Sequence, residues 1–221
     1  MFFDLNQISI DTCDLPFVVG PKGRLHILRD IKNLRIVPAG MAAKYTSELD
    51  CYELQDGLKR LVTELTKDVD AKNRKSRLKN LTICTEYENY RFGEDDKGKE
   101  EYVLRAEKSM FALEPLVHLR PALNVREVTV MGIPTWFASC LEMYIRGDGG
   151  HVNKVDWPTR PMEIRNKNQQ LKREAFVSLR TWHQPVYDWR EFANRNGIEL
   201  PEDVGRFWQV KEWDASLLYW Q

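Results

Sequence analysis

One six-residue pattern occurs three times in this chain at constant spacing. The copies share the order apolar-x-x-apolar-x-apolar and begin 47 residues apart: IKNLRI at residues 31–36, LKNLTI at 78–83 and VREVTV at 125–130. In each copy the last two apolar residues alternate with a polar residue, which is typical of a half-buried β-strand. A related stretch, LNQISI at residues 5–10, precedes the next copy by 26 residues. A strand that recurs in this way predicts a stacked or parallel sheet.

The segments between these strands contain helical patterns. Residues 50–69 carry apolar side chains at the three- and four-residue spacing of one buried stripe, and shorter helices are predicted over 109–119 and 134–146. A strand, a helix and a second strand within 47 residues leave enough chain for a parallel crossover. We therefore expect an α/β fold with a mainly parallel sheet, in which the helices cover one face.

The composition changes after residue 150. Residues 158–174 are rich in Lys, Arg, Asn and Gln, lack clear periodicity and are expected to form a long loop. The last forty residues hold five of the seven tryptophans: Trp182, Trp189, Trp208, Trp213 and Trp220. We expect residues 1–150 to form the repeat-like domain and residues 151–221 to form a linker and a Trp-rich helical cap packed on it, because stacked repeats need a closed end. The alternative is that some of Trp182, Trp213, Tyr219 and Trp220 stay exposed and bind a partner.

The bulk composition excludes a global electrostatic attraction to nucleic acid or to an anionic membrane, because 33 basic and 33 acidic residues give zero formal net charge. No stretch approaches the ~20 apolar residues of a membrane span. The four cysteines are widely spaced, which favours buried reduced thiols in a cytoplasmic or nuclear protein over two disulfides in a secreted one.

The order of apolar residues in the hexamers resembles the core of the leucine-rich repeat. The asparagine or cysteine that this motif places three residues after the last apolar position is replaced by Ala39 and Glu86, and 47 residues is long for one such repeat. The resemblance therefore implies degenerate leucine-rich-repeat-like βα units.

Four stretches of the chain, at residues 123–130, 132–137, 145–150 and 189–203, are similar to uncharacterised filamentous-fungal proteins. Many of those resemble F-box-type proteins, in which an amino-terminal helical module precedes degenerate repeat strands. The F-box-like helices themselves are absent from this sequence. What the resemblance implies is a protein-interaction scaffold without established chemistry, cofactor or metal.

In such a repeat the polar residues between the apolar ones line the open face of the sheet. This places six residues side by side, two per strand: Asn33, Arg35, Asn80, Thr82, Glu127 and Thr129. They are predicted to contact a ligand, together with Trp213 and Trp220, unless the face is merely solvated or covered by a helix. The predicted function is a non-enzymatic scaffold or adaptor with a protein partner.

Two alternative functions stay open at this stage. An enzyme would place its site at the carboxyl ends of the parallel strands, lined by residues 37–40, 84–86 and 131–134. A nucleic-acid binder would use the basic stretch at residues 72–79, which lacks interleaved aromatic residues.

No familiar catalytic motif is present, and the four histidines show no metal-ligand spacing. Residues 147–150, GDGG, follow a predicted helix instead of preceding one, which favours a helix stop over a phosphate-binding loop.

Overall fold

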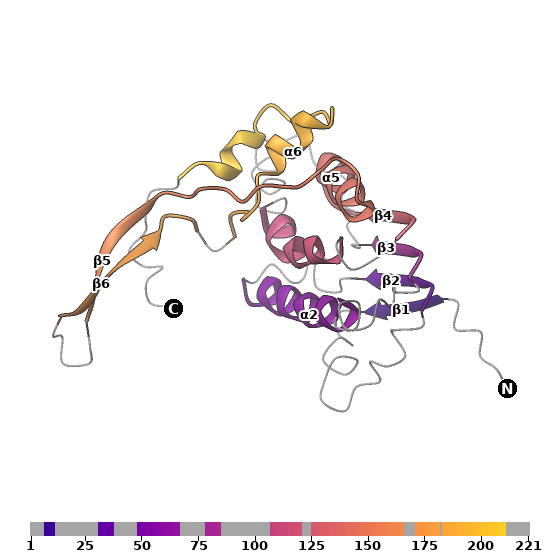
Figure 1. Cartoon of the computed structure of the whole chain (residues 1–221), viewed down its shortest axis with the longest axis horizontal. Helices are drawn as coiled ribbons and strands as arrows, with labels where there is room; N and C mark the ends of the chain where they lie inside the picture. The colour runs from indigo at the N-terminus through magenta and orange to yellow at the C-terminus, as the bar shows by residue number, and fades with distance from the viewer. Residues whose placement is uncertain are drawn as a thin grey trace, which may run out of the picture.

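A computed structural model of the chain describes residues 7–11, 31–37, 48–66, 78–84, 107–120, 125–165, 171–181 and 183–210. Figure 1 shows a row of parallel strands beside a row of helices, and a long two-stranded ribbon that extends away from them. The elements, in chain order, are β1 (Gln7–Asp11), β2 (Asn33–Val37), α2 (Glu48–Thr66), β3 (Asn80–Cys84), η4 (Glu114–Leu119), β4 (Glu127–Met131), α5 (Thr135–Arg146), β5 (Thr159–Arg165), β6 (Leu171–Ser178), α6 (Trp189–Arg195) and η5 (Val204–Trp208).

The main sheet has four strands in the order β1-β2-β3-β4, and every neighbouring pair is parallel. Its register follows the sequence repeat, because Leu34 pairs with Leu81 and Leu81 pairs with Val128. Ile8 of β1 continues this line beside Leu34, although its spacing along the chain differs. The predicted α/β fold with a parallel sheet is confirmed, and each strand begins about two residues later than the hexamer that predicts it.

The apolar positions of the hexamers form the centre of the core. All nine of them in the three 47-residue copies are at most 6% exposed: Ile31, Leu34, Ile36, Leu78, Leu81, Ile83, Val125, Val128 and Val130. Burying one such side chain fully contributes about 1.5–3 kcal/mol, so this ladder accounts for a large part of the driving force for folding. The first apolar position lies before the strand proper and is buried nevertheless.

A helical layer packs against this apolar face. The predicted stripe of α2 is buried at Leu54, Leu58, Leu61, Val62 and Leu65, and α2 packs against η4, which in turn packs against α5. The helix predicted over 50–69 spans residues 48–66, and residues 67–69 lie outside the described residues. Together the four strands and this layer form what we call the βα stack.

The helix predicted over 109–119 changes its type midway. Residues 107–113 are α-helical, and the chain continues as the 3-10 helix η4 from Glu114. Pro115 lies at the start of η4, where its missing N–H and its ring are tolerated, whereas inside an α-helix both would break the hydrogen-bond ladder. The single helix predicted over 109–119 is therefore a short α-helix that continues as a 3-10 helix.

The helix α5 agrees with its prediction at both ends. Pro134 precedes its first residue, and Gly147 terminates it in the left-handed conformation at φ 94°. A side chain at that φ is strained, so glycine suits this position. The Gly147 N–H donates to the carbonyl of Tyr144 at 3.0 Å.

Residues 158–174 are not a long loop, and this expectation is corrected. Strands β5 and β6 form an antiparallel ribbon in which Thr159 pairs with Ser178 and Pro161 pairs with Phe176. A two-stranded ribbon tolerates Pro161 because both of its strands are edges. Phe176 is 75% exposed, so the ribbon presents a large apolar side chain to solvent, and the usual signal of periodic burial is weak there.

The segment after the ribbon returns to the core. Helix α6 packs against α5, and its first residue, Trp189, is fully buried between Phe137 and Tyr144 at ring-centre distances of 5.4 and 5.9 Å. Figure 1 shows α6 beside α5, next to the β4 end of the sheet. Trp208 of η5 is also buried. Residues on both sides of position 150 therefore contribute to one hydrophobic core.

Candidate functional site

The six polar residues predicted to share one sheet face are brought together by the strand register. Asn33 pairs with Asn80, which pairs with Glu127, and one step further along the strands Arg35, Thr82 and Thr129 form a second row. Because side chains alternate across a strand, both rows lie on the face opposite the buried ladder. We call these six residues the polar face.

The polar face is accessible and slightly hollowed. Arg35, Glu127 and Thr129 are exposed, and Asn33, Asn80 and Thr82 are half-buried. A depression of about 310 Å³ is lined by five of the six residues and by Leu81. No side-chain hydrogen bond or ion pair of Asn80, Thr82 or Thr129 occurs within the described part of the chain. The surface therefore offers amide, hydroxyl and carboxylate groups to a ligand.

Sequence reasoning missed a third row, which borders the polar face. Lys32, Lys79 and Arg126 each precede one residue of the Asn33–Asn80–Glu127 row, and all three are exposed. Their backbones are bonded across the strands, since the Lys79 N–H donates to the Lys32 carbonyl at 2.8 Å and the Arg126 N–H donates to the Lys79 carbonyl at 2.7 Å. We call these residues the cation row. The signal was present in the sequence, because the second position of every 47-residue copy is basic.

The carboxyl ends of the strands, where an enzyme site was considered, are described only in part. Cys84 pairs with Met131 in the sheet, but residues 38–40 and 85–86 lie outside the described residues. Cys140 lies in the apolar core, and its burial raises the pKa of its thiol to about 12, which makes it a poor nucleophile. Cys51, Cys84 and Cys140 are free thiols.

The predicted basic stretch and the tryptophans proposed as partner contacts lie largely outside the described residues. Of the basic stretch 72–79 only residues 78 and 79 are described, and Trp182, Trp213 and Trp220 lie outside the described residues. Among the residues that are described, no cluster of three metal-ligating side chains occurs, and no helix is long and apolar enough to cross a membrane.

The GDGG loop is held by its carbonyl groups. Arg120 donates to the carbonyls of Gly147 and Gly150, and Asn196 donates to the carbonyl of Gly149 at 3.2 Å. A phosphate site needs free backbone amide donors. In this loop the groups that are bonded to Arg120 and Asn196 are backbone carbonyls, which accept hydrogen bonds. The predicted helix stop is the reading that this geometry favours.

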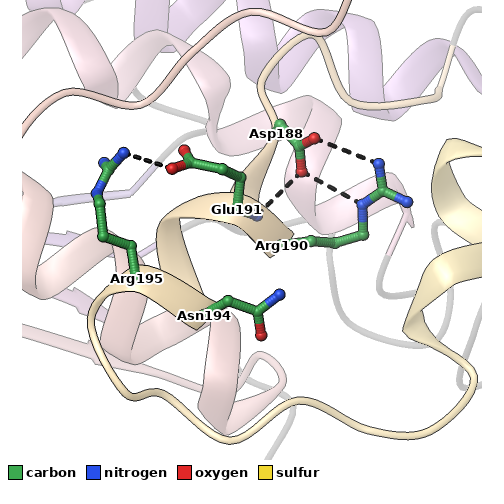
Figure 2. Close-up of a pocket in the computed structure, with 5 residues that line it drawn as sticks. All are labelled: Asp188, Arg190, Glu191, Asn194 and Arg195. Atoms are coloured by element: carbon green, nitrogen blue, oxygen red, sulfur yellow. Dashed lines mark hydrogen bonds and ion pairs between the residues drawn. The ribbon is translucent and has the colours of Figure 1, made fainter.

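A second surface depression, of about 610 Å³, lies on α6 (Figure 2). Asp188 accepts from the Glu191 amide at 3.1 Å and thereby caps the helix, while Arg190 bonds Asp188 and Arg195 bonds Glu191. The charged groups that line this depression are thus already paired with one another, and the depression offers no excess charge to a ligand.

A buried polar cluster joins the helix of residues 107–119 to the segment before α6. The Nε2 atom of His183 lies 2.7 Å from a carboxylate oxygen of Glu107, and Glu114 accepts a hydrogen bond from the Val186 amide. Burial raises the pKa of Glu114 to about 7, although the Val186 hydrogen bond and the positive charges of Arg180 and Lys59 act in the opposite direction. A raised carboxyl pKa is typical of catalytic sites as well as of structural ones.

The role of this cluster is settled by what surrounds it. Glu114 is 8% exposed, and its hydrogen bond comes from the backbone amide of Val186. Gln184 is fully buried and donates to the carbonyl of Gln209 at 2.7 Å, while Trp157 donates to the carbonyl of Pro185 at 3.0 Å. The cluster fastens the chain between the ribbon and α6, and the polar face remains the best candidate for ligand binding.

Comparison of the chain with protein-family models, with curated proteins and with solved structures found no match. The resemblance to fungal F-box-like proteins stays a prediction, and the functional argument depends on the polar face alone.

Proposed function

We propose that this protein is a non-enzymatic protein-interaction domain built from degenerate leucine-rich-repeat-like βα units, and that it contacts its partner through the polar face. One observation carries the proposal. The six residues predicted from the repeat as ligand contacts lie next to one another across adjacent strands, and five of them line one accessible depression.

The character of the polar face supports binding of protein rather than chemistry on a small molecule. It combines amides, hydroxyls and charges on a rigid sheet, and such groups suit the polar contacts of a protein interface. The face includes no histidine or cysteine among its six residues, and the carboxylate of Glu127 has no second carboxylate beside it in the sheet register. General acid–base or nucleophilic catalysis would need such partners.

The Trp-rich carboxyl-terminal segment has a structural part in this proposal. Stacked repeats expose an apolar end that must be closed. The contact of α6 with α5 and the burial of Trp189 and Trp208 support a capping role for α6 and η5. Trp213 and Trp220 are retained as proposed partner contacts. The proposed kinship with F-box-like adaptors fits this arrangement of strands and helices, and it would supply an adaptor context.

The proposal is tested by capture of partners from an extract of the organism that encodes the protein. Thr82→Arg with Thr129→Arg places two bulky cations on the polar face, and Asn153→Arg with Asn194→Arg adds the same charge at exposed positions elsewhere. We expect a stoichiometric protein partner with the wild type and with the second variant, and at least a tenfold loss with the first (about 1.4 kcal/mol). Equal capture by all three, with folding verified by circular dichroism, contradicts the proposal.

A further inference from the structure

The cation row and the polar face give this part of the molecule a charge that the whole chain lacks. The polar positions of the three hexamers contain four cations, Lys32, Lys79, Arg126 and Arg35, and one carboxylate, Glu127, although the chain as a whole is neutral. The basic residues are therefore not distributed evenly between this surface and the rest of the protein.

Two cations of this row, Lys79 and Arg126, follow each other across adjacent strands and repel one another. Neighbouring strands lie about 4.8 Å apart, and like charges directly opposite each other in a sheet are unfavourable. Lys79 and Arg126 take part in no ion pair within the described residues, and both side chains are exposed. An anionic ligand laid across the strands would relieve this repulsion and meet several cations at once.

We propose that this surface binds an acidic segment of the partner protein, with its carboxylates on Lys79 and Arg126 and its backbone beside Asn80 and Thr82. This inference rests on the proposed function and specifies the chemistry of its partner. Arg126 suits a carboxylate because its guanidinium can form two parallel hydrogen bonds. The amide of Asn80 can donate to a peptide carbonyl and accept from a peptide N–H.

The same cations would also attract phosphate groups, so nucleic acid is the competing ligand. Single-stranded nucleic acid is usually bound where aromatic side chains stack on its bases. None of the nine polar positions of the hexamers is aromatic, and Glu127 places a negative charge on β4, directly beside Asn80 in the sheet register. These features favour a peptide, in which carboxylates are interspersed with neutral groups.

The test uses the full chain and three fluorescein-labelled probes of equal length: a peptide of alternating Glu and Ser, a peptide of alternating Lys and Ser, and a thymidine oligonucleotide. Binding is followed by fluorescence anisotropy at low and at high salt. Lys79→Glu with Arg126→Glu reverses the charge of the surface. Arg60→Glu with Lys154→Glu makes the same change in net charge at exposed positions of α2 and of the segment before β5.

We expect saturable binding of the Glu peptide, a loss of at least tenfold in the first variant and a change within about twofold in the second. The loss should shrink at high salt, because exposed charges are screened, and the first variant should gain affinity for the Lys peptide. The inference is overturned by absent binding of the Glu peptide, by equal losses in both variants, or by tighter binding of the oligonucleotide with a steep salt dependence.

The two proposals fail in different ways. If capture of a protein partner depends on Thr82 and Thr129 while charge reversal of Lys79 and Arg126 leaves peptide binding unchanged, the acidic specificity is wrong and the proposed function stands. If capture of the protein partner is unchanged by substitution of either pair of residues, the polar face itself is not the binding surface.

Discussion

Glu114 illustrates how a single residue of the core responds to its surroundings. Its carboxyl group is buried, and the cost of removing a charge from water outweighs the Val186 hydrogen bond and the two nearby cations. Tyr187 faces it too, and the pKa of Tyr187 is raised by its own burial and by Glu114. Sequence alone offered no sign of this, because burial of Glu114 depends on the segment around residues 183–187, about seventy residues further along the chain.

The raised pKa of Glu114 has a consequence for stability that is testable with one variant. A carboxyl whose pKa rises on folding, here from 4.5 to about 7, stabilises the protein below pH 4.5, and this contribution is lost as the pH rises through 7. Glu114→Gln retains an acceptor for the Val186 amide and removes the titration. We therefore expect the stability of the wild type relative to this variant to fall by about 2–3 kcal/mol between pH 5 and pH 8.

Urea unfolding of both proteins at the two pH values measures this difference directly. Taking the difference cancels the contributions of the other titrating groups, as long as their environment is unchanged. A difference that is the same at pH 5 and pH 8 would show that Glu114 titrates alike in the folded and unfolded states.

At the scale of elements, the outer edge of β4 is closed by a side chain. The Val130 N–H donates to Glu142 of α5 at 2.7 Å, so a group of an edge strand that could pair with another chain is already bonded. Edge strands with free backbone groups invite association. This hydrogen bond helps to explain why the parallel sheet ends at β4 in the structure.

Replacement of Glu142 should therefore affect both stability and self-association. Glu142→Ala leaves the amide of Val130 without its partner in a half-buried position, and we expect a loss of about 1–3 kcal/mol in the free energy of unfolding together with concentration-dependent oligomers. Glu142→Gln keeps an acceptor of the same length and should show the same stability and association state as the wild type. Light scattering after size-exclusion chromatography, with thermal unfolding, distinguishes these outcomes, and wild-type behaviour of the alanine variant would contradict the role assigned to Glu142.

The secondary-structure elements differ in how well the sequence predicts them. The helix α5 was predictable because Pro134 and Gly147 mark its ends and its apolar face is regular. The ribbon β5–β6 was not, because a two-stranded element that projects away from the core buries little and its sequence is crowded with polar residues. The change from α- to 3-10 geometry at Glu114 could not be predicted from Pro115 alone. Its position depends also on where the preceding helix begins.

At the scale of the whole molecule, the pattern of apolar and polar positions in the repeat predicted the βα stack. The apolar positions at 34, 81 and 128 pair across the sheet because each strand must bury the same face, and a slip of one residue would expose the entire ladder. The polar face follows from the same register, because side chains alternate between the two faces of a strand. The cation row was not predicted, because the second position of each hexamer precedes the strand and the alternation of side chains in a strand does not apply to it.

The central claim, that the polar face binds a partner protein, is tested most directly by site-specific photo-crosslinking. A photoreactive phenylalanine analogue is placed at Thr82 in one protein and at Asn194, on the exposed side of α6, in another. We expect light to produce a discrete covalent adduct with a protein partner from position 82 and none from position 194. An adduct from position 194 alone, or from neither position, would contradict the claim.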